Sequence, residues 1–188
     1  NKGGMAATLH QMGNLAYVIG DLNGARCMYD ESLKKKLVIG NKRSIAATLH
    51  QIGIMAKDAG DLDEARRLYN DSLKISRELG DKGGIAITLH QIGIMAKDAG
   101  DLDEARRLYN EGFELYQDLG DKRGMAFSLA QLALLEEQQG NVQAAIDLTS
   151  QSLSIFEQIG ANIYAKKALY QKERLEKKLA EMGSKQSE

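Results

Sequence analysis

The chain has 188 residues, of which 43% are hydrophobic and 5% aromatic, with no Trp. Its 25 basic and 26 acidic residues nearly cancel, which argues against nucleic acid or a membrane surface as partner. A single Cys excludes an intrachain disulfide framework and fits a reducing compartment such as the cytoplasm. No apolar run reaches the roughly 18 residues needed to span a bilayer. The chain begins at Asn1 rather than Met, so we expect it to be a piece of a longer protein.

The sequence repeats with a period of 40 residues. Residues 48–70 recur unchanged as residues 88–110, and looser copies begin at Thr8 and Ser128. A period of this length predicts a solenoid, in which each repeat buries its apolar face against its neighbours. The complete repeats cover residues 1–40, 41–80, 81–120 and 121–160. The near-identity of the second and third repeats indicates recent duplication or consensus design, and the divergent first and fourth repeats favour duplication.

Two glycines divide each repeat into two helices. One set lies in mid-repeat and the other at the repeat end: Gly20, Gly60, Gly100, Gly140, and Gly40, Gly80, Gly120, Gly160. All but the last are followed by Asp or Asn. Because Gly suits the left-handed position after a helix and Asp or Asn suits the next N-cap, each repeat should form helix A, a tight turn, helix B and another turn. Asp61 with Glu64 also has the spacing of a capping box.

The apolar spacing supports this division. The second repeat carries apolar residues at helical spacing in both halves: Ile45, Leu49, Ile52, Ala56, and Leu62, Ala65, Leu68, Tyr69, Leu73. Gly13, Gly53 and Gly93 lie inside helix A, where Gly costs about 1 kcal/mol relative to Ala. That cost is reasonable where helix B presses on the backbone, and small residues of helix B are its expected partners: Ala25, Ala65, Ala105, Ala145.

The segment after the fourth repeat differs from the others. Its apolar residues form one stripe beside a strongly charged side: Ala165, Ala168, Leu169, Leu175, Leu179, Met182. A terminal repeat needs such a polar outer face, so residues 161–182 are expected to form a capping helix. Residues 183–188 are expected to be a disordered tail.

The pattern of small and large residues resembles the tetratricopeptide repeat (TPR). In the second repeat it is carried by Leu49, Ile52, Gly53, Ala56, Gly60, Ala65 and Tyr69. The first and third repeats match at the same positions, whereas the fourth lacks the Tyr. The 40-residue form is similar to arrays in Pins-like adaptors and bacterial TPR regulators. The family's Pro near the end of helix B is absent, so helix B should run longer; its place holds Leu37, Arg77, Gln117 and Glu157.

The resemblance implies an all-α, right-handed superhelical solenoid of antiparallel helix pairs, with four repeats and the capping helix. In this family helix A lines a concave surface that binds peptides. The family's ligand-contacting positions correspond here to His10, Asn14, Tyr17, His50, Ile54, Lys57, Ile87, His90, Ile94, Lys97, Phe127, Gln131 and Leu134. Such a groove would suit an extended or helical peptide with apolar side chains and some acidic character.

Several of these residues have a plainer interpretation. The histidines could be solvated residues copied with the repeat, and Lys57 and Lys97 could belong to a solvated charge pattern with the Asp that follows each. If the histidines do contact ligand, their protonation below about pH 6.5 should strengthen binding of an acidic peptide. A shared metal site is disfavoured, because neighbouring helices pack 8–10 Å apart while Zn–N bonds are about 2 Å. Cys27 is expected to be a surface thiol, and methionines such as Met55 to fill the core.

The sequence therefore favours a non-catalytic scaffold that binds a protein or peptide partner of unknown identity. It has no phosphate-binding loop, metal-ligand cluster or nucleophile constellation, so no enzyme activity, metal or cofactor is expected. Two alternatives stay open. One is a structural module that self-associates weakly through open solenoid ends. The other is the sensor array of a larger signalling regulator.

Overall fold

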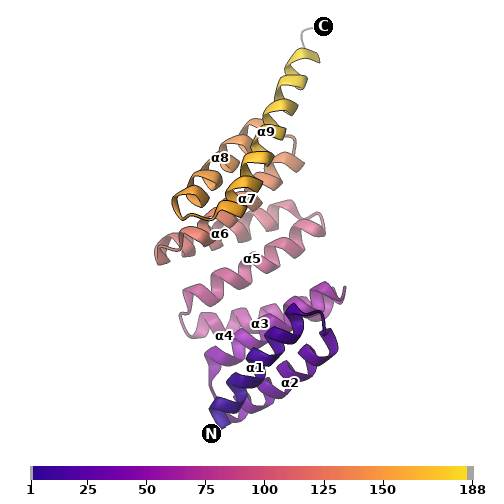
Figure 1. Cartoon of the computed structure of the whole chain (residues 1–188), viewed down its shortest axis with the longest axis vertical. Coiled ribbons are helices and arrows are strands. Elements are labelled where there is room, and N and C mark those ends of the chain that lie inside the picture. Colours follow the sequence, from indigo (N-terminus) through magenta and orange to yellow (C-terminus); the bar gives the residue numbers. More distant parts are fainter. Residues whose placement is uncertain (1, 186–188) are drawn as a thin grey trace. The chain divides into compact units, whose positions relative to one another are not determined.

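The computed structural model describes residues 2–185, and the side chains of residues 3–182. Every regular element in that range is an α-helix (Figure 1), which confirms the all-α prediction. The helices are α1 Lys2–Val18, α2 Leu22–Ile39, α3 Lys42–Asp58, α4 Leu62–Glu78, α5 Lys82–Asp98, α6 Leu102–Leu119, α7 Lys122–Gln138, α8 Val142–Gln158 and α9 Asn162–Lys185. Within residues 2–185, no helix is both long enough and apolar enough to cross a membrane.

The helices alternate as predicted, with helix A of each repeat followed by helix B. The chain divides within α5 into two compact units, Asn1–Ile92 and Gly93–Glu188. In the first unit, α1 packs on α2, α2 on α3, and α3 on α4. In the second unit, α6 packs on α7, α7 on α8, and α8 on α9. Each A–B pair is antiparallel because only a tight turn joins its helices.

The predicted helix boundaries are confirmed by the cap geometry. Gly60 ends the turn after α3 with φ +83°, a left-handed value that a residue with a Cβ rarely adopts. Asp61 follows it; its backbone N–H donates to Ala56 O at 2.9 Å and its carboxylate accepts from Glu64 N at 3.1 Å. The corresponding Asn141 makes no side-chain cap bond. The B helices continue past the position of the missing Pro, as predicted.

The core of each A–B pair forms where helix A carries a glycine. A Cβ built on Gly13 would lie 2.8 Å from the ring of Tyr29, and one on Gly93 would lie 2.7 Å from the ring of Tyr109. The residue that presses on the mid-helix glycine is therefore the tyrosine, which the sequence argument had not identified. The expected small partners are fully buried: Ala25, Ala65, Ala105 and Ala145. Leu62 is the exception to the predicted stripes, because its side chain is 54% exposed.

The last helix, α9, buries only part of its predicted stripe. Ala165 and Ala168 pack on Phe156, and Leu175 is enclosed by residues of α8. Leu169 and Met182 are exposed, so their assignment to the buried stripe was wrong. The helix also runs on to Lys185 instead of ending at residue 182, because a single Gly costs about 1 kcal/mol and does not by itself stop a helix. Residues 186–188 of the predicted disordered tail lie outside the described residues.

Candidate functional site

We use "helix-A face" as the name for the thirteen predicted residues on α1, α3, α5 and α7, and describe them separately in each compact unit. Within the first compact unit this face contains a cavity of about 220 Å³. His10, His50 and Ile87 line it together with the neighbouring Ala47 and Gln51. Three helices A thus contribute to one cavity. Its rim is open to solvent, since Ala47 and Ile87 are exposed.

The floor of the cavity consists of small polar residues that sequence reasoning missed. Ser72 and Ser76 of α4 and Thr88 of α5 are all buried there. Ser72 Oγ donates to the backbone oxygen of Ala46 at 2.9 Å, and Thr88 Oγ1 donates to that of Gly84 at 2.8 Å. Both hydroxyls are therefore satisfied. The available sequence signal was the small side chain at 76, where the other repeats carry large ones.

The histidines join successive helices A. The Nδ1 atom of His10 lies 3.3 Å from Thr48 Oγ1, and that of His50 lies 3.2 Å from Thr88 Oγ1. The His50 side chain is 8% exposed, so the interpretation of a solvated histidine is wrong for it. Burial, reinforced by the charge of Lys57, lowers the pKa of His50 to about 4. Protonation near pH 6.5 is therefore not available to His50, and that part of the prediction was wrong.

Tyr17 and Lys57, which occupy the same position in successive repeats, each form a hydrogen bond to the next helix A. The Tyr17 hydroxyl donates to the carboxylate of Asp58, and Lys57 Nζ donates to Gln91 Oε1 at 3.2 Å. In the second unit, Lys97 Nζ donates likewise to Gln131 Oε1 at 3.3 Å. These lysines also lie 3.7 and 3.9 Å from the Asp that follows each of them. Their amino groups are thus already engaged.

Asn14 and Ile54 occupy the same place in successive repeats, but only Asn14 can accept a hydrogen bond from the tyrosine of helix B. Asn14 Oδ1 accepts a hydrogen bond from the hydroxyl of Tyr29 at 2.6 Å. In the second repeat Ile54 supplies no acceptor, and the buried hydroxyl of Tyr69 has no hydrogen-bond partner among the described residues. His90, which corresponds to His50, is half-buried. So are Ile94 and Leu134, which correspond to Ile54 in the third and fourth repeats.

A second cavity, of about 260 Å³, lies in the second unit and is lined in part by Phe127 and Gln131. Phe127 belongs to an aromatic cluster, with its ring centroid 5.2 Å from that of Phe156 and 4.8 Å from that of Tyr164. The Arg123 guanidinium lies 5.6 Å from the centroid of the Tyr164 ring. This cavity lies at the place in the fourth repeat that corresponds to the first cavity, and it stays open beside Phe156.

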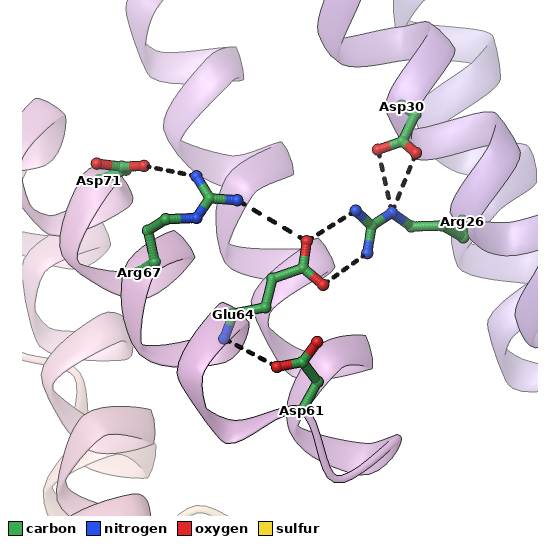
Figure 2. A network of polar contacts seen from close by, with 6 residues as sticks. All are labelled: Arg26, Asp30, Asp61, Glu64, Arg67 and Asp71. Atoms are coloured by element: carbon green, nitrogen blue, oxygen red, sulfur yellow. Dashed lines mark hydrogen bonds and ion pairs between the residues drawn. The ribbon is translucent and has the colours of Figure 1, made fainter.

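The B helices carry a charge network that the sequence argument missed (Figure 2). The Arg26 guanidinium forms two hydrogen bonds with the Glu64 carboxylate, at 2.9 and 3.2 Å, and contacts Asp30 on its own helix. Arg67 lies between Glu64 and Asp71. The hydrogen bonds from Arg26 are the main reason why the pKa of Glu64 is lowered. This network joins helix B of the first repeat to helix B of the second, and it does not involve residues of the helix-A face.

Known proteins match the chain through both sequence and structure. A family model for the tetratricopeptide repeat matches residues 44–118 and 84–158, which together cover more than half of the chain. No curated protein sequence matches it. BtubC (BKLC) from P. vanneervenii has 17% sequence identity and a TM-score of 0.72, with 95% of this chain and 82% of that chain covered.

Two further structures are similar. The apo form of RapI has 15% identity and a TM-score of 0.82, with 94% of this chain and 64% of that chain covered. Aspartyl phosphate phosphatase F from Bacillus subtilis has 9% identity and a TM-score of 0.84, with 89% of this chain and 44% of that chain covered. The chain thus spans less than two thirds of these two proteins, and at such identities the likeness concerns the fold. The family itself follows from the sequence match: this chain belongs to the tetratricopeptide repeat family.

Proposed function

We propose that the chain is a non-catalytic scaffold whose helix-A face binds a peptide segment of a partner protein. The observation that carries this proposal is the solvent-open cavity lined by His10, His50 and Ile87 from three helices A. Tetratricopeptide repeats generally act as protein-interaction modules, which supports the assignment. Its single exposed Cys27 is compatible with a reducing compartment, and we propose the cytoplasm as its location.

The predicted residues contribute unequally to this proposal. Ile87 is 50% exposed at the cavity rim and can lose apolar surface to a ligand, at roughly 25 cal/mol per Å². His50 is buried, so its contribution would be to form part of the cavity wall. Lys57 and Lys97 are held by Gln91 and Gln131, so they would attract acidic side chains only weakly, at about 0.2–1 kcal/mol each.

A selection of random displayed peptides against the folded protein tests the proposal. The selected peptides should lose binding to an Ile87→Asp variant, because the change places a charge on the cavity rim. Leu62→Asp is the matched control, since Leu62 has nearly the same exposure (54%) but lies on helix B. Equal binding to both variants, or loss only with Leu62→Asp, would place the site elsewhere and reject the proposal.

Self-association is a second candidate function, and one observation favours it. Leu15 on α1 is 64% exposed, whereas the corresponding Met55 is 7% exposed. Met12 and Val18 extend the same apolar face. A second copy could cover this face, while residues 161–182 are proposed to cap the opposite end. The mass in solution at two concentrations decides: a mass that rises with concentration supports association, and a constant monomer mass rejects it.

A further inference from the structure

A threonine determines which nitrogen of His50 carries the proton. Thr88 Oγ1 lies 2.8 Å from the backbone oxygen of Gly84 and 3.2 Å from His50 Nδ1. A hydroxyl has one proton and a carbonyl oxygen has none, so the Thr88 proton must lie between these two oxygens. Thr88 Oγ1 can therefore only accept from His50. It follows that the neutral imidazole carries its proton on Nδ1 and a lone pair on Nε2.

The same arrangement recurs at His10, one repeat earlier. Thr48 Oγ1 donates to the backbone oxygen of Ser44 at 2.9 Å and accepts from Lys36 Nζ at 2.7 Å. Its remaining lone pair faces His10 Nδ1 at 3.3 Å. Because the hydroxyl proton is already used, His10 Nδ1 must be the donor in this contact. Its Nε2 is therefore also an acceptor.

Both lone pairs are available to a ligand at pH 7. Burial lowers the pKa of both histidines, and the nearby charges of Lys36 and Lys57 lower the pKa of His10 and His50 further, so both rings are neutral. Neither Nε2 forms a hydrogen bond among the described residues, and neither is one of the sealed side-chain atoms that lack a partner. Both rings line the 220 Å³ cavity. The cavity thus presents two hydrogen-bond acceptors that the protein itself does not use.

The other polar groups of the lining do not reverse this character. Ser72 Oγ donates to a backbone oxygen at 2.9 Å, and Arg43 Nε at the rim pairs with Asp81 Oδ2 at 3.1 Å. Ser76 and Gln51 can each donate or accept. A carboxylate brings no proton and would face the two lone pairs. An ammonium group would be repelled by the lysine charges that lower the histidine pKa values. A neutral group with its own N–H protons suits the cavity better than either.

We propose that this cavity binds a side-chain carboxamide, Asn or Gln, of the partner peptide, with its N–H donating to His50 Nε2. The inference rests on the proposed function, because it names the group that the helix-A face would recognise. The carboxamide oxygen could accept from the hydroxyl of Ser76. An engineered cavity of about 150 Å³ is known to bind benzene, so about 220 Å³ is enough for the smaller amide. Thr88 is a positioning residue, since it sets the proton on His50.

Nitrogen NMR of the His50 imidazole at pH 7.5 tests the first step. We expect a protonated Nδ1 and an unprotonated Nε2, the reverse of the form that predominates in free histidine. Thr88→Val should move the proton to Nε2, and Thr88→Ser should keep it on Nδ1. Thr149→Val is the matched control, since Thr149 is also buried and donates to a backbone oxygen, that of Ala145, at 2.7 Å. A protonated Nε2 in the unchanged chain overturns the proposal, whether or not the Val variant folds by circular dichroism.

Acetamide and acetate test the second step, because they have the same shape and differ in their protons. Acetamide added to the whole chain should shift the signal of His50 Nε2, whereas acetate should not. Thr88→Val should weaken the response to acetamide at least about tenfold relative to Thr149→Val, because its Nε2 no longer accepts. No shift with acetamide, or an equal shift with acetate, overturns the proposal.

The peptide selection supplies the third readout. Selected peptides should be enriched in Asn or Gln, and exchange of that residue for Asp or Glu should weaken binding at least about tenfold. Enrichment of Asp or Glu, or equal binding after the exchange, would overturn the carboxamide site while leaving the peptide-binding proposal intact. Failure to select any peptide would contradict the proposed function, and acetamide would then judge the site alone.

Discussion

The ring of Tyr69 lies against the backbone of Gly53, so that a Cβ on Gly53 would be 2.8 Å from the ring. Tyr69 is fully buried and cannot move aside. Gly53→Ala should therefore destabilise the chain by about 1–3 kcal/mol, because overpacking outweighs the gain in helix propensity. Gly4→Ala is the control, since nothing lies within 4 Å of its Cβ, and it should be neutral or stabilising. Equal effects on the free energy of unfolding in urea would show that the Tyr69 contact is loose.

The hydroxyls of Tyr29 and Tyr69 provide a second matched pair. Tyr29→Phe removes a buried hydrogen bond to Asn14 and should cost about 0.5–1.5 kcal/mol. Tyr69→Phe removes a hydroxyl without a partner among the described residues, so it should be neutral or stabilising. Thermal or urea unfolding of the two variants checks the order. A larger loss for Tyr69→Phe would mean that its hydroxyl is hydrogen-bonded in solution.

The ion pair between Arg26 and Glu64 should give the stability a pH dependence. Glu64→Gln should cost about 0.5–1 kcal/mol at pH 7, since both partners are partly exposed. The folded state lowers the pKa of Glu64, so its contribution is present above its ordinary value of 4.5 and disappears as the pH falls through the folded-state pKa. Urea unfolding at several pH values measures this difference. Glu104→Gln, which removes a pair with Arg107 on the same helix, should cost less.

His50 should titrate far below an ordinary histidine. Its pKa of about 4 is lower than the unfolded value of 6.5, so the unfolded state takes up a proton first as the pH falls. The contribution of His50 to stability should thus be complete above pH 6.5 and should decline between about pH 6.5 and 4. An NMR titration of the imidazole is the measurement. A midpoint near 6.5 would show that His50 is solvated after all.

The fold was predictable because its signals are local. Gly60 and Asp61 mark a helix end and the next helix start through backbone geometry that those two residues set themselves. The candidate site was less predictable, because its character depends on neighbours in other repeats. His50 lies on the predicted face, yet the adjacent helix buries it. The floor of the cavity includes Ser72 and Ser76 of helix B and Thr88 of the next helix A, and the sequence alone does not show that these residues meet.

The most direct test of peptide binding by the helix-A face is an isoleucine methyl NMR spectrum of the chain with a peptide taken from the displayed random library. The account predicts shifts for Ile54, Ile87 and Ile94, which lie on the helix-A face. Isoleucines on helices B should keep their positions, as judged from Ile75 and Ile155. Shifts confined to Ile75 and Ile155, with Ile87 unchanged, would place the binding surface on the B helices and contradict the account.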